Sequence, residues 1–171
     1  MLNIHIFDLD NTLIYTNQLN NDSYNYALTK LGLVPIVSCS RVTRKIVLNH
    51  YPFLDKHQQD KLIQLKQAYF IKHINETELN LHLHGVVHSH SSEFCVLWTS
   101  AEKERVLPLL EHYQLQCAFA KIIYSSKDNV RRDIEKICQS FSCTSQQLLF
   151  YEDNSVIIEV LRSLGQTVIS V

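Results

Sequence analysis

The sequence predicts an α/β protein with a parallel sheet flanked by helices and a small all-helical insertion after the first strand. In residues 84–171, short apolar runs of strand length alternate with segments of helical spacing, and repeated strand–helix units of this size build parallel sheets. Residues 15–83 instead show helical spacing and no long β-rich run. We therefore expect a core made of residues 1–14 and 84–171 and a helical cap made of residues 15–83.

The individual elements follow from periodicity and from stop signals. The first strand opens the chain, and a polar, Asn-rich stretch at residues 16–22 is typical of a turn. In the cap, helices are expected at about residues 23–31, 40–49 and 55–74. In the core, strands are expected at residues 94–98, 119–124, 147–151 and 167–171. Core helices are expected from the capping-box pattern at residues 99–102 through residue 113, and at 129–141 and 155–164.

Two carboxylates interrupt the apolar run at the start of the chain. Asp8 and Asp10 lie two positions apart, so in an extended chain both face one side. Burying them together is costly, because like charges repel and an ionised carboxylate without a partner loses its hydration. A divalent cation with oxygen ligands resolves the conflict, and Mg²⁺ is the ion expected in a cell. The second acid is then free to donate a proton.

Composition limits the classes of partner. The 171 residues suit one domain, or a core with an insertion, and 46% of them are hydrophobic. A formal net charge of -1 gives no field that favours nucleic acid or an anionic membrane. Five cysteines without C-x-x-C spacing are expected to be reduced thiols. No apolar run approaches the roughly 20 residues of a membrane helix, and no signal-peptide pattern precedes the first strand, so we expect a cytoplasmic protein.

Polar side chains also follow later strands, at the edge of the sheet where ligands bind in such folds. Thr99 and Ser100 follow an apolar strand, where a hydroxyl and backbone N–H groups can hold a phosphoryl oxygen. The alternative is that Thr99 caps the next helix, with Glu102 as its capping-box partner. Lys127 lies near a helix start, where an anion would offset its repulsion from the helix dipole. Its alternative is a solvated surface lysine, and Lys121 is a weaker candidate.

Glu152 and Asp153 end another hydrophobic strand, and two carboxylates there would complete an oxygen shell for the cation proposed at Asp8. The alternative is that Asp153 or Asn154 caps a helix.

The opening motif Phe-Asp-Leu-Asp-Asn-Thr-Leu resembles that of the haloacid dehalogenase-like superfamily. The order of the later residues, a hydroxyl after a strand, a lysine and an acid pair, is also the order of that family's motifs. The resemblance implies a Rossmann-like core with a cap that sets substrate choice. It further implies that Asp8 is the nucleophile and Asp10 the acid/base, that Thr99, Ser100 and Lys127 bind phosphate, and that Thr12 orients the acid/base loop. The implied Mg²⁺ ligands are Asp8, Asp10 through its backbone carbonyl, Glu152 and Asp153.

The resemblance implies a Mg²⁺-dependent phosphomonoester hydrolase of the branch that holds β-phosphoglucomutase and phosphoglycolate phosphatase, acting on a small phosphorylated metabolite. A phosphomutase and a non-catalytic phosphate-binding or regulatory protein with the same fold are the alternatives. The chain departs from the family pattern in Asp128, where Pro is common after the lysine, and in Asn11, where Gly is frequent. The cap is also short for the branch. Oligomeric state has no signature in the sequence.

A histidine-rich segment, with His82, His84, His88 and His90, offers a second candidate metal site. Two H-x-H pairs can in principle ligate zinc or nickel. A segment with Gly85 at the return from cap to core gives little of the rigid placement that such a site needs. We expect adventitious metal binding more than a physiological site.

Overall fold

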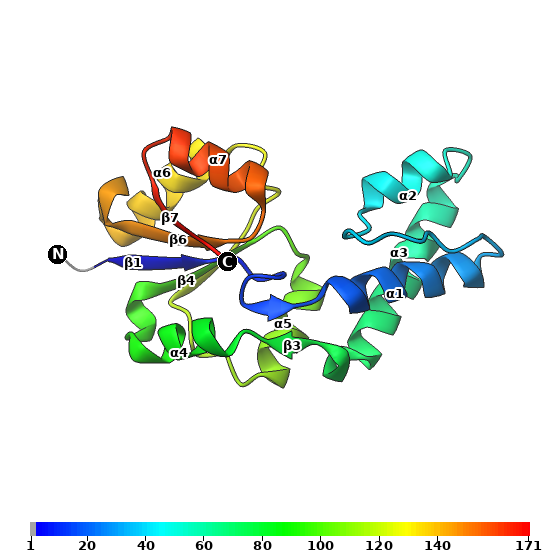
Figure 1. Cartoon of the computed structure of the whole chain (residues 1–171), viewed down its shortest axis with the longest axis horizontal. Coiled ribbons are helices and arrows are strands. Elements are labelled where there is room, and N and C mark those ends of the chain that lie inside the picture. The colour runs from blue at the N-terminus through cyan, green and yellow to red at the C-terminus, as the bar shows by residue number, and fades with distance from the viewer. Residues whose placement is uncertain (1–2) are drawn as a thin grey trace. The chain divides into compact units, whose positions relative to one another are not determined.

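The computed structural model describes residues 3–171 and contains a five-stranded parallel sheet in the order β5-β4-β1-β6-β7 (Figure 1). The strands are β1 (Ile4–Phe7), β4 (Cys95–Thr99), β5 (Lys121–Tyr124), β6 (Leu148–Glu152) and β7 (Thr167–Ser170). Every residue of β1 and β4 is buried, as expected for central strands covered on both faces. The predicted fold class is confirmed.

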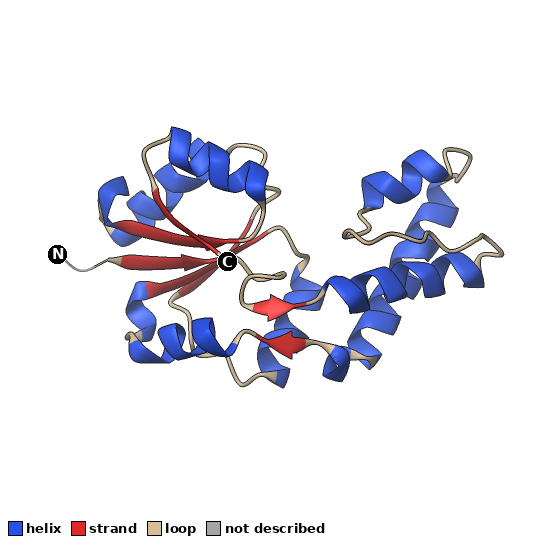
Figure 2. Cartoon of the chain, viewed as in Figure 1, coloured by secondary structure: helices blue, strands red, loops and turns tan. Residues whose placement is uncertain are grey.

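Helices cover both faces of this sheet. They are α4 (Leu81–Ser89), α5 (Lys103–His112), α6 (Val130–Phe141) and α7 (Ser155–Ser163). Figure 2 shows α6 and α7 on one face and α4 and α5 on the other. On the α6 face, Val130, Ile134 and Ile137 pack with Trp98 and Phe150 in one apolar cluster. Because all strands are parallel, their carboxyl ends meet at one edge, where Asp8 directly follows β1 and where β4 and β6 end in Thr99 and Glu152.

The remaining helices form a second compact unit, Tyr15–Glu78. It contains α1 (Asn17–Lys30), α2 (Arg44–His50) and α3 (Lys56–Lys72), with its own apolar cluster around Ala27 and Leu28. Asp55 begins α3 with a capping box that includes Gln58. Two short strands, β2 (Ile14–Tyr15) and β3 (Glu78–Leu79), lie where the chain passes between the units and form a two-stranded sheet. Short 3-10 helices occupy Ile74–Glu76, Ser92–Phe94 and Ser145–Gln147.

The division by contacts places residues before Tyr15 and Leu79–Val171 in the first unit. Residues 79–83, which the sequence analysis placed in the cap, therefore group with the sheet. The assignment of residues 15–83 to a cap remains a proposal. No helix among the described residues has both the length and the apolar character needed to cross a lipid bilayer.

Two local expectations are wrong. The stretch predicted as a turn is the first part of α1, because Leu19 and Asn20 are buried there and the Asn20 amide donates to the Val42 carbonyl at 2.8 Å. These tertiary contacts override the local turn preference of asparagine. The capping box at Thr99 is also absent: Thr99 is the last residue of β4, and α5 begins at Lys103 without a side-chain cap.

Candidate active site

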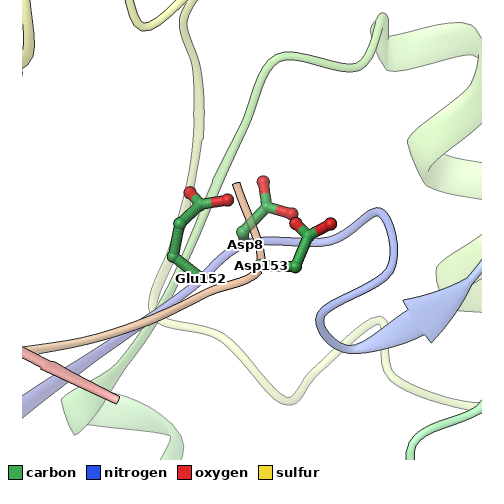
Figure 3. A group of neighbouring side chains, drawn as sticks. All are labelled: Asp8, Glu152 and Asp153. Atoms are coloured by element: carbon green, nitrogen blue, oxygen red, sulfur yellow. The ribbon is translucent and has the colours of Figure 1, made fainter. Parts of the chain in front are cut away.

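The candidate site lies at the carboxyl end of β1 and β6, where three carboxylates gather (Figure 3). Asp8 directly follows β1, Glu152 ends β6 and Asp153 comes next. Phe7 is paired with Tyr151, and the Asp8 backbone N–H donates to the Tyr151 carbonyl at 3.0 Å. This register places Asp8 beside Glu152 and explains why residues 144 positions apart in the sequence share one site.

A buried lysine joins two of these carboxylates. The Lys127 ammonium donates to Asp8 Oδ1 and to Glu152 Oε2, each at 2.6 Å, and all three side chains are almost fully buried. Burial raises the pKa of Asp8 and the neighbouring Glu152 adds to the rise, while Lys127 opposes it. Burial alone would lower the pKa of Lys127, but the Asp8 and Glu152 carboxylates outweigh it and the pKa is raised. Lys127 is therefore a buried cation and not a surface lysine.

The connection between β5 and α6 holds Lys127 in place. Lys127 has a left-handed backbone, φ 60°, which is uncommon for a residue with a side chain. Its N–H donates to Ser125 Oγ at 3.1 Å, and its ammonium lies 4.3 Å from the centre of the Trp98 ring. Ser125 and the Trp98 indole both donate to the carboxylate of Asp133, a buried residue of α6. Asp133 thus holds Ser125 and Trp98, the two residues that contact Lys127.

Asp153 is held from the first loop. Thr12 Oγ1 donates to Asp153 Oδ1 at 3.3 Å, so Thr12 contacts a candidate metal ligand. Burial and the adjacent Glu152 carboxylate raise the pKa of Asp153. The capping role falls to Asn154, whose side chain accepts from the N–H groups of Val156 and Ile157 at the start of α7.

Thr99 and Ser100 lie at the same edge, after β4. Thr99 is fully buried, and its hydroxyl accepts from the Ala101 N–H at 3.0 Å. Ser100 is exposed. Leu97, two residues before Thr99, pairs with Phe7, the residue before Asp8. The structure therefore brings both residues to the sheet edge that carries Asp8.

Asp10 has a different environment from the three clustered carboxylates. Its oxygens accept from the two terminal nitrogens of Arg105, Oδ1 from Nη1 at 2.9 Å and Oδ2 from Nη2 at 2.5 Å. Sequence reasoning missed Arg105, because a single arginine in the charged run Lys103–Glu104–Arg105 at a helix start is typical of a solvated face. It missed Asp133 for the same reason. Burial is the feature that distinguishes these two residues, and local sequence does not carry it.

The three clustered carboxylates fit a hard divalent cation. Each offers an oxygen, and these oxygens lie within 4.8 Å of one another. When all three are ionised, the Lys127 ammonium leaves two negative charges without a counter-charge in a largely buried site. A hard divalent cation would supply two positive charges and prefers oxygen ligands. Asp10 contributes no carboxylate oxygen to this group.

The histidine-rich segment forms no comparable group. Among residues 3–171, the Asp8 group is the sole set of three or more potential ligands close enough for one ion. His84 and His88 lie on successive turns of α4, with their Nε2 atoms 2.9 Å apart, and the His90 ring instead packs against His5 at 3.9 Å between centroids. His90 is thus separated from the His84–His88 pair, and adventitious metal binding by this segment stays a prediction.

Comparison with known proteins identifies the family. Residues 5–171 match a family model described as haloacid dehalogenase-like hydrolase. No curated protein matches the chain. Among solved structures, a predicted phosphoglycolate phosphatase from Haemophilus somnus 129pt has a TM-score of 0.83 at 16% identity, with 99% of this chain and 84% of that chain covered.

Two further solved structures share the fold. CbbY from Rhodobacter sphaeroides, in complex with phosphate, has a TM-score of 0.75 at 15% identity and covers 99% of this chain and 86% of its own. A haloacid dehalogenase-like family hydrolase from Streptococcus pneumoniae has a TM-score of 0.73 at 18% identity, with 99% of this chain and 84% of that chain covered. The similarity therefore extends along nearly the whole chain.

Proposed function

The chain belongs to the haloacid dehalogenase-like hydrolases, and from this premise we propose that it is a Mg²⁺-dependent phosphomonoesterase that works through an aspartyl-phosphate on Asp8. One observation carries the proposal. The Asp8 carboxylate is buried at the end of β1, with the Lys127 ammonium at 2.6 Å and the Glu152 and Asp153 carboxylates beside it. A nucleophile and a cation for an anionic substrate are thus assembled in one place.

The chemistry divides into two displacements at phosphorus. In the first, an Asp8 oxygen bonds to phosphorus, the bond from phosphorus to the leaving oxygen breaks, and Asp10, which enters this step in its protonated form, gives that oxygen its proton. In the second, a water molecule gives a proton to Asp10 and attacks phosphorus, which releases inorganic phosphate and restores the Asp8 carboxylate. Each residue ends the cycle as it began.

The remaining residues handle charge. Lys127 stabilises the negative charge on the transferring phosphoryl group, with Thr99 and Ser100 as further phosphate contacts. Asp8, Glu152 and Asp153 would hold Mg²⁺, which offsets the repulsion between an anionic nucleophile and an anionic substrate. The Thr12 hydroxyl keeps Asp153 turned toward this site through its hydrogen bond.

The proposed substrate is a small phosphorylated metabolite. Support comes from two of the similar folds, one described as a predicted phosphoglycolate phosphatase and one solved with phosphate bound. The panel to test holds sugar phosphates, phosphoglycolate, nucleoside monophosphates and p-nitrophenyl phosphate.

Phosphate release from this panel tests the function. It is measured for wild type and for Asp8→Asn, with Mg²⁺ and with EDTA. We expect release that requires Mg²⁺ and falls by on the order of 10³-fold or more in Asp8→Asn. The matched control is Asp60→Asn, an exposed position on α3 that leaves the site intact. No release by folded wild type from any compound would contradict the proposal, as would full activity in Asp8→Asn.

A further inference from the structure

A second ion pair lies beside the cluster, between Arg105 of α5 and Asp10. The side chains expose 6% and 12% of their surface, and both terminal nitrogens of Arg105 donate to the carboxylate in a parallel fork. Such two-pronged pairs fix the plane of the carboxylate as well as its position. Asp10 is therefore held in one orientation by a residue 95 positions away in the sequence.

The place of Arg105 on its helix indicates that its role concerns Asp10. Arg105 is the third residue of α5, in the first turn, where a cation meets the positive end of the helix dipole. Burying its guanidinium adds a desolvation cost. Both costs oppose the stability of α5 itself, and the Asp10 carboxylate offsets them. A solvated or purely helix-stabilising arginine would not be buried at this end.

The fork leaves Asp10 able to react. An ionised carboxylate has about four lone-pair positions, and the two N–H groups of Arg105 use one on each oxygen. The contact thus orients the carboxylate and does not exhaust its capacity to accept a proton.

We propose that Arg105 is a positioning residue that aims the Asp10 carboxylate at the reacting oxygen. The proposal rests on the proposed function, in which Asp10 exchanges a proton with the leaving group and with water. Lysine cannot replace the arginine, because a single ammonium lacks the planar pair of donors. Small misplacement of a catalytic group costs up to about 10²-fold in rate.

The test is a kinetic double-mutant cycle with p-nitrophenyl phosphate and Mg²⁺. It compares wild type, Arg105→Lys, Asp10→Asn and the variant with both substitutions. We expect Arg105→Lys to lower kcat by about 10- to 100-fold with KM within about twofold of wild type. In the Asp10→Asn background the same change should cause no further loss, because Arg105 acts through Asp10. Arg162→Lys, an exposed position on α7, is the matched control and should keep wild-type kinetics.

Each other outcome overturns the positioning role. A rise in KM at unchanged kcat would make Arg105 a substrate contact, and equal losses in both backgrounds would make it a structural residue. An unchanged or higher kcat would mean that the fork does not aim Asp10. Thermal melts of each variant check folding, and loss of the folded state in both Arg105→Lys and Arg105→Met would assign the pair to structure alone. The proposed function fails separately, if wild type releases no phosphate or does not need Asp8.

Discussion

Asn11 occupies a backbone position that disfavours most side chains. Its φ is 61°, in the left-handed region, and its N–H donates to the Ile14 carbonyl at 2.7 Å, which closes the loop after the two aspartates. Glycine is the residue that adopts this conformation without strain, and asparagine is the next most tolerant. The departure from the family pattern at this position therefore preserves the shape of the loop.

Substitutions at Asn11 should reveal this backbone requirement. We expect Asn11→Ala to be less stable than Asn11→Gly by about 0.5 to 1 kcal/mol, because alanine is strained at positive φ while both variants lose the amide. Urea unfolding of the two variants measures the difference. An alanine variant as stable as the glycine variant would mean that the loop does not need the left-handed conformation.

His5 is the residue whose burial predicts a pH effect on stability. Its Nδ1 lies 3.0 Å from the Tyr151 hydroxyl and its ring packs against His90. Burial lowers the pKa of His5 below its ordinary value of 6.5, and the neighbouring His90 lowers it further. The unfolded chain therefore binds this proton first, so stability falls as the pH drops from about 6.5 toward the lower folded-state pKa.

We expect His5 to lower the free energy of unfolding between pH 7 and pH 5, so over this range His5→Gln should lose less stability than wild type, or gain more. His57→Gln, an exposed position on α3, should keep the wild-type slope. Urea unfolding at several pH values gives the slopes. Parallel slopes for wild type and His5→Gln would show that His5 has the same proton affinity in both states.

At the scale of elements, the connection from β5 to α6 depends on Asp133. This carboxylate accepts the Trp98 indole at 3.1 Å and the Ser125 hydroxyl, and Ser125 in turn holds the Lys127 backbone. The network ties the candidate phosphate-binding lysine to a buried point on a helix. Lys127 itself has a left-handed backbone, and the network fixes its position, which the loop alone would not do.

Asp133→Leu should loosen this connection. The substitution leaves the buried Trp98 indole and the half-buried Ser125 hydroxyl without this acceptor, which should lower the free energy of unfolding by roughly 1–3 kcal/mol. Trp98 is the single tryptophan of the chain, so its fluorescence should also shift. Glu135→Leu, an exposed position on the same helix, is the control. An unshifted emission with unchanged stability would remove Asp133 from the support of Lys127.

The elements of the core could be predicted because the local sequence pattern there favours the same structure as the tertiary contacts do. The strands around Val96 and Phe150 are apolar runs of strand length, and α6 begins at an asparagine that caps it. The errors lie where tertiary contacts decide. Asn20 looked like a turn residue but is paired inside α1, and Thr99 looked like a helix cap but belongs to β4.

At the scale of the whole molecule, the site residues that local sequence pattern marks could be predicted, and those that depend on tertiary contacts could not. Asp8 and the Glu152–Asp153 pair lie at the ends of strands, so chain order and the parallel sheet were enough to bring them to one edge. Lys127 was grouped with them by the order of the family's motifs. Arg105 and Asp133 lie inside helices, and their roles depend on which helix face meets the sheet. No local signal in the sequence distinguishes them from solvated charges.

Charge balance in the site predicts that Mg²⁺ stabilises the fold. An ion bound to the folded state alone adds about 2.7 kcal/mol to the free energy of unfolding at a concentration 100 times its Kd. Lys127→Met leaves the Asp8 and Glu152 carboxylates without their cation, so we expect it to be destabilised in EDTA and to gain more from Mg²⁺ than wild type does. Urea unfolding in EDTA and in Mg²⁺ measures both effects.

Lys121→Met is the control for this comparison, because Lys121 is exposed and its ammonium donates only to Ser140 among the contacts described. It should match wild type under both conditions. Equal Mg²⁺ stabilisation of wild type and Lys127→Met would mean that the lysine and the metal do not share the carboxylates.

The most direct test of the account is to trap the covalent intermediate. Borohydride reduces an acyl phosphate on aspartate to homoserine, which mass spectrometry locates in the peptide that contains Asp8. We predict homoserine in place of Asp8 when wild type is mixed with Mg²⁺ and a substrate from the panel, and unmodified Asp8 when either is left out. Hydrolysis of the substrate with Asp8 unmodified, and with Asp8→Asn equally active, would contradict the central claim.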